Sequence, residues 1–403
     1  MDILSEKRVI RDPIHGYIHI DNRVIWDLLS TKEVQRLRRV RQLGSTLMVF
    51  PSGEHSRFTH SLGAYEIARR MVNEVDDLAN SLTEREKMVV MIAALLHDVG
   101  HAPFSHSFET IMKHNHEEYT IQIIKGPSEV AQVLRAVDDD LPDEVASVIE
   151  HTHPNAILCQ LISSQLDCDR LDYLLRDSYF TGVSYGQIDL DRILRTMRVS
   201  NGKVVVKSSS IYTVENYIMA RYHMYLQVYY HPNSRSFDTL LREVFVRLKD
   251  LWQQDPDIVR DFPMYEDLLE NDMLTNEQFY QLDDSTCIYS FHLMENYHDP
   301  ILQDLARRIL ERDLLEHVSV NKADELKKKA EEKGFDANYY VVTDLHSQIP
   351  YQPYKVDDSE KIWVINEEGK ILELSQISDT VKALSSLTNE DERVFYPREI
   401  LDD

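Results

Sequence analysis

The sequence "HDVGHAPFSH", residues 97–106, places three histidines and one aspartate within ten residues, directly after a long apolar run. Two interpretations compete for it. One is a metal-centred site that acts on a phosphate, and the other is an ordinary helix end with hydrogen-bonded or solvated imidazoles. An isolated His-Asp pair occurs by chance in many chains. The choice between the two therefore depends on which residues elsewhere in the chain could join this stretch.

The apolar run before His97 has helical periodicity and lacks breakers, so it predicts a helix. Thr83 followed by Glu86 predicts a capping box at its start, and Gly100 allows the chain to turn after its end. Consecutive residues on a regular helix diverge by about 100°. His97 and Asp98 can therefore share one ion only because we expect them at a helix end.

Candidate partners for this pair lie in "QLDCDRLDYLLRD", residues 165–177. Asp169, Tyr173 and Asp177 are spaced at i, i+4 and i+8, so they share one face of the predicted helix. The competing interpretation is the polar side of an amphipathic helix. As a functional face, it could bind an ion and a polyphosphate together.

The 403-residue chain is acidic, with 69 Asp and Glu against 44 Lys and Arg and a net charge of −25. This charge argues against broad nucleic-acid binding, although it leaves open a basic groove at an oligomer interface. An anionic substrate needs a local basic site. The run "KEVQRLRRVR", residues 32–41, offers five cations against one Glu, unless it is only a solvated helix face.

The three cysteines show no CxxC spacing, which argues against a disulfide scaffold or a thiolate zinc site and favours a reducing compartment. The N-terminal segment has no apolar signal region, and no run approaches eighteen apolar residues. We therefore expect a cytoplasmic protein without membrane insertion.

The periodicity predicts a mainly α fold with three β-containing parts. Residues 8–20 alternate around a turn and predict an N-terminal hairpin. Asn201-Gly202 between β-rich runs predicts a small inserted hairpin at 197–207. The composition changes near residue 300, so we expect a helical core over 1–300 and a smaller α+β C-terminal lobe over 301–403, the latter in oligomer contacts.

His60, His97-Asp98 and Asp169 occur in the order H…HD…D, which resembles the signature of the HD superfamily of metal-dependent phosphohydrolases. Further segments over residues 7–235 are similar in order and spacing to its deoxynucleoside triphosphate triphosphohydrolases, which include the vertebrate enzyme with a SAM domain and its bacterial relatives. These segments are "DPIHGYI", "QRLRRVRQLG", "VFPSGEHSRFTHSLG", "LLHDVGHAPFSHSFE", "HEEYT" and "DCDRLDYLLRDSYFTGV".

This resemblance implies an HD-domain helical core and a role for each matching residue. The implied metal ligands are His60, His97, Asp98 and Asp169. The implied catalytic residues are His101 and His106, near the α-phosphate and leaving oxygen, and His116 with Glu109, which form an acid/base relay. Glu109 stands at a position where the family usually has Asp. The implied substrate contacts are Gln42, Leu43, Arg57, Arg170, Tyr173, Asp177, Arg221 and Tyr229, beside Tyr225 where the best-known member has His.

The resemblance also implies the reaction, which is hydrolysis of a dNTP at the α-phosphorus to a deoxynucleoside and inorganic triphosphate. Two His and two Asp ligands leave coordination positions for a water and a phosphate oxygen. Such ligands suit Mn²⁺, Fe²⁺, Mg²⁺, Co²⁺ or Zn²⁺, and the family uses one or two ions. A histidine near neutrality can protonate the 5′-oxygen.

Members of this type are commonly homotetramers, or dimers of dimers, with nucleotide effectors such as dGTP or GTP between subunits. The matching effector positions are Arg8, Val9, Arg38, Arg192 and Lys207. Ser30 replaces the acidic residue that reads guanine in the vertebrate enzyme, and Arg11 replaces a nearby Asn. The resemblance therefore implies effector control more strongly than guanine selectivity.

Two alternatives remain open from the sequence. The first is an HD phosphohydrolase that acts on a nucleoside monophosphate, a cyclic dinucleotide or guanosine tetraphosphate. The second is a non-catalytic nucleotide sensor or nucleic-acid-binding module that keeps the fold. The intact ligand set argues against the second, and product analysis would separate the first from a dNTP triphosphohydrolase.

Overall fold

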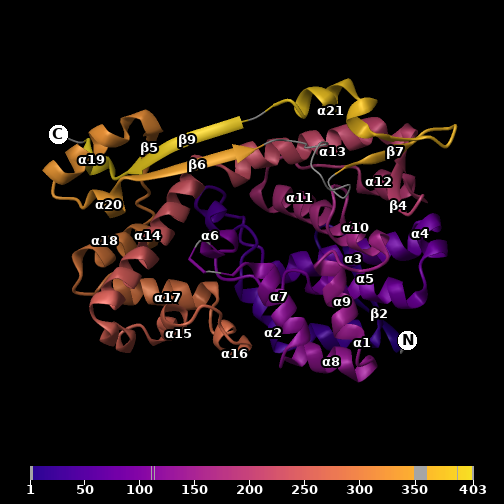
Figure 1. Cartoon of the computed structure of the whole chain (residues 1–403), viewed down its shortest axis with the longest axis horizontal. Helices are drawn as coiled ribbons and strands as arrows, with labels where there is room; N and C mark the ends of the chain where they lie inside the picture. The colour runs from indigo at the N-terminus through magenta and orange to yellow at the C-terminus, as the bar shows by residue number, and fades with distance from the viewer. Residues whose placement is uncertain (1–2, 110, 113, 349–360, 388, 402–403) are drawn as a thin grey trace.

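Helix α5 (Glu84–Leu96) lies at the centre of the helical core (Figure 1). The structure is a computed structural model, and it describes residues 3–109, 111–112, 114–348, 361–387 and 389–401. Helix α5 begins with the predicted capping box, in which the Thr83 side chain accepts from the Glu86 backbone N–H and the Glu86 carboxylate accepts from the Thr83 backbone N–H. It ends at Leu96, so that His97 is its C-cap. The predicted helix end is therefore confirmed.

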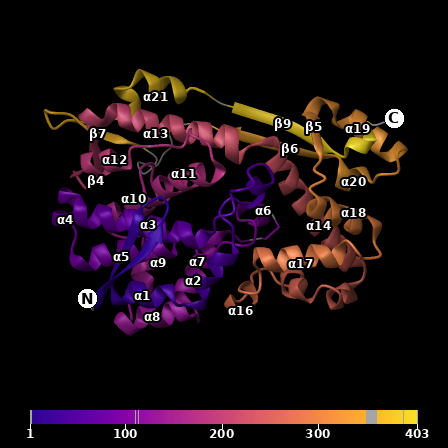
Figure 2. The ribbon, with the colours of Figure 1, turned by 180° about the vertical axis from the view of Figure 1, so that it is seen from behind.

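Helices make up most of the chain, as predicted (Figures 1 and 2). Before residue 255 the other helices are α1 (Arg23–Leu29), α2 (Lys32–Arg36), α3 (Arg57–Glu74), α4 (Asp76–Ser81), α6 (His106–Glu109), α7 (His116–Lys125), α8 (Glu129–Val137), α9 (Leu141–Ile149), α10 (Ala156–Ile162), α11 (Cys168–Thr181), α12 (Leu190–Thr196), α13 (Ile211–Met224) and α14 (Pro232–Gln254). After it come α15 (Glu266–Glu270), α16 (Asn276–Phe279), α17 (Asp284–Met294), α18 (Pro300–Glu311), α19 (Ala323–Glu332), α20 (Ala337–Tyr340) and α21 (Asp379–Leu384).

Short helical turns join these helices, and one of them is a π-helix, η4 (Tyr225–Tyr229), which continues α13. The 3₁₀ turns are η1 (Leu37–Arg39), η2 (Gly44–Met48), η3 (Ser208–Ser210), η5 (Pro256–Arg260), η6 (Pro263–Tyr265), η7 (Val320–Lys322), η9 (Leu374–Gln376) and η10 (Arg398–Ile400). Among the described residues we find no helix with the length and hydrophobicity needed to cross a bilayer.

Both predicted hairpins are present. Strands β1 (Ile3–Asp12) and β2 (Gly16–Asn22) pair antiparallel, and the Ile18 and Ile20 side chains of β2 are buried against the helices. Strands β3 (Met197–Ser200) and β4 (Lys203–Lys207) form the inserted hairpin. Both residues of its Asn-Gly turn have positive φ, 53° and 71°, which is the conformation that an Asn-Gly turn favours.

The C-terminal part is α+β, as predicted, and its strands lie in two sheets. Strands β5 (Glu316–Ser319), β9 (Asn389–Tyr396) and β6 (Val342–Gln348) form one sheet in that order. β6 and β9 cross one side of the molecule, beyond α14 (Figure 1). Strands β7 (Trp363–Ile365) and β8 (Ile371–Glu373) instead extend the inserted hairpin, with β7 parallel to β4. The boundary at residues 300/301 therefore remains a prediction, because this pairing connects the two parts.

The core that holds these parts together is one continuous cluster of buried apolar side chains, running from Ile18 in β2 to Phe395 in β9. Within it, α3 and α11 meet at Gly63, one helical turn after His60. A Cβ at Gly63 would lie 1.8 Å from Asp172 Oδ1 and 2.4 Å from Arg176 Nη2. Gly63 therefore makes the space in which Asp172 reaches His60.

We predict that Gly63→Ala lowers the free energy of unfolding by at least about 2 kcal/mol, because the new methyl group must displace a buried ion pair. Chemical denaturation measures this loss. Gly182→Ala is the matched control, since nothing lies within 4 Å of its Cβ position and it carries only the cost of φ 76°, about 1 kcal/mol. Equal losses in the two variants would contradict the steric account.

Candidate metal centre and nucleotide pocket

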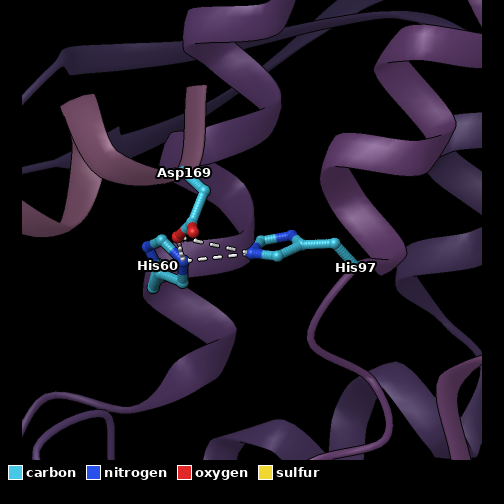
Figure 3. A group of neighbouring side chains, drawn as sticks. All are labelled: His60, His97 and Asp169. Atoms are coloured by element: carbon cyan, nitrogen blue, oxygen red, sulfur yellow. Dashed lines mark hydrogen bonds and ion pairs between the residues drawn. The ribbon is translucent and has the colours of Figure 1, made fainter. Parts of the chain in front are cut away.

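Three predicted ligands converge between three helices, as Figure 3 shows. His60 lies in α3, His97 at the C-terminus of α5 and Asp169 in the first turn of α11. His60 Nε2 lies 3.3 Å from His97 Nε2 and 3.0 Å from Asp169 Oδ1, and His97 Nε2 lies 3.6 Å from the same oxygen. One nitrogen from each ring and one carboxylate oxygen therefore face a common point.

Asp98, the fourth predicted ligand, is buried beside the same point. Its Oδ1 lies 3.4 Å from His97 Nε2, and its Oδ2 lies 3.6 Å from His60 Nε2. Burial alone raises the pKa of Asp98, but the charges of Arg57, His97 and His101 outweigh burial and hold this pKa well below its usual range. The structure therefore brings together all four residues that the resemblance implied.

The far nitrogens of both rings are hydrogen-bonded to the protein. His60 Nδ1 donates to Asp172 Oδ2 at 2.8 Å, and His97 Nδ1 donates to the Ala94 carbonyl oxygen at 2.8 Å. These bonds select the tautomer that leaves each Nε2 lone pair directed at the common point, as in histidine ligands of metals. The residues present therefore fit a divalent cation.

Protonation energetics point the same way. Burial alone lowers the pKa of His60, but hydrogen bonds to Asp169 and Asp172 outweigh burial and raise it to about 10. Burial alone raises the pKa of Asp169, but the two histidines hold it well below its usual range. The carboxylates thus create a strongly negative environment, which a divalent ion in place of the protons would satisfy.

Sequence reasoning missed the residues that orient His60. Asp172 is fully buried and accepts hydrogen bonds from His15 Nε2 at 2.6 Å and from Arg176 Nε at 2.8 Å, besides the one from His60. Arg176 also donates to Asp12 Oδ2 at 2.8 Å. The segment "DPIHGYI", residues 12–18, contains Asp12 and His15, but only the fold places it beneath the metal centre.

Three of the predicted catalytic residues form a second group next to the metal centre. His116 Nδ1 donates to Glu109 Oε1 at 2.6 Å, so the side chain of Glu109, which is one methylene longer than Asp, still makes this hydrogen bond. The rings of His101 and His116 stack with centroids 3.9 Å apart, and His101 Nε2 lies 3.2 Å from Asp98 Oδ1. Asp98, His101 and His116 are close enough to hold a second ion.

The fourth predicted catalytic residue, His106, begins helix α6, but its side chain lies outside the described residues. The sequence also allowed His101 to continue the face of His97 if α5 continued. Helix α5 ends first, and His101 instead reaches Asp98 from the turn that follows. Gly100 permits α7 to approach there, since a Cβ would lie 2.2 Å from the His116 carbonyl oxygen.

The basic run at 32–41 supports the loop after His101, and none of its side chains lines the pocket beside Asp169. Arg36 is fully buried and donates to the carbonyl oxygens of His101 and Leu282. Burial lowers the pKa of Arg36 to about 10. The loop also contains Phe104 and Ser105, whose φ angles of 52° and 57° are rare for residues with a side chain. These contacts hold the loop in that conformation.

A pocket of about 620 Å³ opens beside Asp169, a volume typical of small-molecule sites. Seven of the eight predicted substrate contacts line it: Gln42, Leu43, Arg57, Arg170, Tyr173, Asp177 and Tyr229. The eighth, Arg221, is buried and donates to Gln165 Oε1 at 2.5 Å rather than lining the pocket. Tyr225 also lines it. Asp169, Tyr173 and Asp177, which share one face of α11, all line the pocket.

Asp177 is held on both of its oxygens. His55 Nε2 donates to Oδ1 at 2.8 Å, and the Tyr229 hydroxyl donates to Oδ2 at 2.7 Å. Tyr229 ends the π-helix η4, and π-helical turns are frequent at functional sites because they redirect side chains. Sequence reasoning assigned no role to His55, whose ring stacks on Phe180.

Two of the predicted effector residues, Arg192 and Lys207, line a separate pocket of about 530 Å³. Arg192 donates to the Ser209 carbonyl oxygen and to Thr213. Arg8, Val9 and Arg38 do not line this pocket. Arg8 lies over Trp26, and Arg38 lies over Phe58.

We predict that Asp172→Asn weakens metal binding about 10- to 100-fold, because His60 loses the carboxylate that orients its ring. Isothermal titration calorimetry of the metal-free protein with Mn²⁺ measures the metal affinity. Asp12→Asn is the matched control, since it also removes one carboxylate from Arg176 but does not contact His60. An equal loss in both variants would mean that the charge on Arg176, not the orientation of His60, controls the site.

Known proteins resemble this chain in sequence and in fold. The HD domain profile matches residues 57–177, and the HD associated region matches residues 188–262. The uncharacterized protein YwfO of Bacillus subtilis is 43% identical, with 99% of this chain and 94% of YwfO covered. A phosphohydrolase from Bacteroides thetaiotaomicron, known from its crystal structure, superposes with a TM-score of 0.85 at 29% identity over 98% of this chain and 100% of its own.

Deoxynucleoside triphosphate triphosphohydrolases are also related to this chain. The SAMHD1 homolog of Dictyostelium discoideum is 31% identical over 60% of this chain and 49% of its own length, and SAMHD1 of Bos taurus is 26% identical over 62% and 49%. The alignment thus covers about half of these relatives. With its matching domain and its converging His and Asp side chains, the chain belongs to the HD-domain family of metal-dependent phosphohydrolases.

Proposed function

We propose that this protein hydrolyses dNTPs to a deoxynucleoside and inorganic triphosphate. The observation that carries the proposal is one pocket that joins the predicted metal ligand Asp169 to Arg57 and Arg170 and to the paired Asp177 and Tyr229. Arginines suit a phosphate chain, whereas a fixed carboxylate suits a sugar hydroxyl. The relationship to SAMHD1 supports the same substrate class.

Arg57 and Arg170 would bind the phosphates. Arg57 is already fixed, because its guanidinium pairs with Asp98 and donates to Ser105 Oγ at 2.9 Å. Donors fixed before the substrate binds stabilise developing phosphoryl charge without reorganisation. A divalent ion held by the four predicted ligands would supply Lewis-acid charge neutralisation and a lower pKa for its water.

Asp177 and Tyr229 would bind the sugar. The carboxylate, held by His55 and Tyr229, can accept a hydrogen bond from the 3′-hydroxyl. Gln42 and Leu43 line the same pocket, where we propose that they close the space around C2′. This fit would favour a deoxyribose over a ribose.

The pair of His116 and Glu109 would deliver the proton to the 5′-oxygen. Glu109 Oε1 accepts from His116 Nδ1, so when His116 carries both ring protons its Nε2 would give its proton to the leaving oxygen. His101, stacked on His116, and His106 would lie against the phosphates. In this proposal, His101 and His106 orient the phosphates, and His116 with Glu109 transfers one proton.

We predict that the purified protein with Mn²⁺ or Mg²⁺ releases inorganic triphosphate from dNTPs, resolved by ion-exchange chromatography. His97→Ala with Asp98→Ala should lower turnover at least about 10³-fold and abolish metal binding, since two ligands are lost. His114→Ala is the control, because His114 pairs with Glu118 away from the metal ligands. Phosphate or pyrophosphate as the sole product would instead indicate an HD phosphohydrolase with another substrate.

We also propose that nucleotide effectors such as dGTP or GTP bind between subunits of a homotetramer, or dimer of dimers, at the positions of Arg8, Val9, Arg38, Arg192 and Lys207. A pocket of about 530 Å³ supports an anionic ligand at Arg192 and Lys207, because five cations line it against three acids. The C-terminal lobe would contribute to the subunit contacts.

Under this proposal, Lys207→Ala should raise the effector concentration for half-maximal stimulation about tenfold or more, because a charged phosphate contact is lost. Initial rates with and without dGTP or GTP measure the effect, and basal turnover should stay unchanged. Lys327→Ala, an exposed lysine on α19, is the control. If no added nucleotide stimulates the wild-type protein, effector control is ruled out.

A further inference from the structure

One wall of the nucleotide pocket has no role in the function proposed above. It is a face of α14, where Arg235, Asp238, Thr239 and Arg242 follow one another at i, i+3, i+4 and i+7 and all line the pocket. In Figures 1 and 2, α6 lies between α14 on one side and α3, α5 and α11 on the other. This α14 face therefore belongs to the side of the pocket away from the helices that hold the metal ligands.

The two arginines of the α14 face are paired with acids of the protein itself. Arg235 is buried and donates to Asp344 Oδ2 at 2.8 Å and to Asp391 Oδ2 at 2.6 Å. Arg242 donates to Glu243 Oε1 at 3.0 Å. Acids of the protein itself therefore hold Arg235 and Arg242 in place, as Asp98 holds Arg57.

Asp238 has a different environment. Its hydrogen bonds among the described residues come from neutral hydroxyls, with Ser107 Oγ donating to Oδ1 at 2.5 Å and Ser45 as the second donor. Burial raises the pKa of Asp238 to about 6, despite these hydroxyls. At neutral pH the pocket wall thus carries a carboxylate whose charge is poorly compensated by hydrogen bonds, a strong acceptor for N–H groups of a ligand.

The order of groups in a nucleotide determines what would meet this carboxylate. The phosphates are placed at Asp169, Arg57 and Arg170, and the sugar at Asp177 and Tyr229, so the base must extend away from the metal ligands. We propose that Asp238 selects the base, by accepting hydrogen bonds from its N–H groups. This inference rests on the proposed dNTP hydrolysis and adds base preference to it.

The four bases differ in what they offer a carboxylate. Guanine presents a ring N–H and an amino group side by side, which match the two oxygens. Adenine and cytosine present an amino group next to an unprotonated ring nitrogen. Thymine presents one N–H between two carbonyl oxygens, and the carboxylate would repel both of these oxygens. We therefore expect dGTP to be the best substrate and dTTP the poorest.

The test compares kcat/KM for the four dNTPs in the wild-type protein and in Asp238→Asn. The wild type should favour dGTP over dTTP about tenfold or more, the value of a hydrogen bond to a charged group. Asp238→Asn keeps the size of the side chain and an acceptor for Ser107, and it should bring this ratio close to one. Asp238→Ser is a second variant that removes the charge, and the same fall in the ratio is expected.

Thr239→Val is the matched control. Thr239 lines the same wall, but its hydroxyl donates to the Arg235 carbonyl oxygen within α14, so the ratio should not change. If Asp238→Asn lowers all four kcat/KM values equally, Asp238 acts by holding α6 through Ser107, and the inference is overturned. A wild-type ratio near one also overturns it, with dNTP hydrolysis intact. A wild type that releases triphosphate from no dNTP overturns the proposed function and this inference together.

Discussion

The buried carboxylate of Asp172 is the group on which the metal centre depends. It accepts hydrogen bonds from His60, His15 and Arg176, which come from α3, the N-terminal hairpin and α11. A buried carboxylate is stable only when such donors compensate its lost hydration. The carboxylate that orients His60 therefore also joins three segments distant in sequence. Position 63 is a glycine because a Cβ there would collide with this carboxylate.

The site is preorganised by contacts that lie outside it. Arg36 and the Asp284 carboxylate hold the loop that carries His101 and Ser105, since Asp284 Oδ1 accepts from the Phe104 backbone N–H at 2.9 Å. Two residues of this loop adopt positive φ at a cost of roughly 1–2 kcal/mol each. Strain of this kind persists only where the surroundings fix the conformation, and here it keeps the hydroxyl of Ser105 on Arg57.

The walls of the pocket come from different parts of the chain. The metal ligands and Asp177 come from the HD domain, Tyr229 from the π-helix, and the outer wall from α14 and Asp344 of β6. An HD domain alone thus supplies charge and metal ligands, whereas the later helices and the C-terminal strands shape the opposite side.

Local patterns were enough to predict much of this protein. Apolar periodicity predicted the helices, Thr83 with Glu86 the start of α5, and Asn201-Gly202 the inserted hairpin, because each signal lies within a short segment. The order H…HD…D, a family motif, indicated the His and Asp side chains that the fold brings together at the candidate metal centre. Tertiary structure alone decided that Asp172 orients His60, that the basic run supports a loop, that β7 joins β4, and that Arg221 turns to Gln165. These outcomes depend on which distant side chains compensate a buried charge or complete a hydrogen bond, and that is not encoded by spacing along the chain.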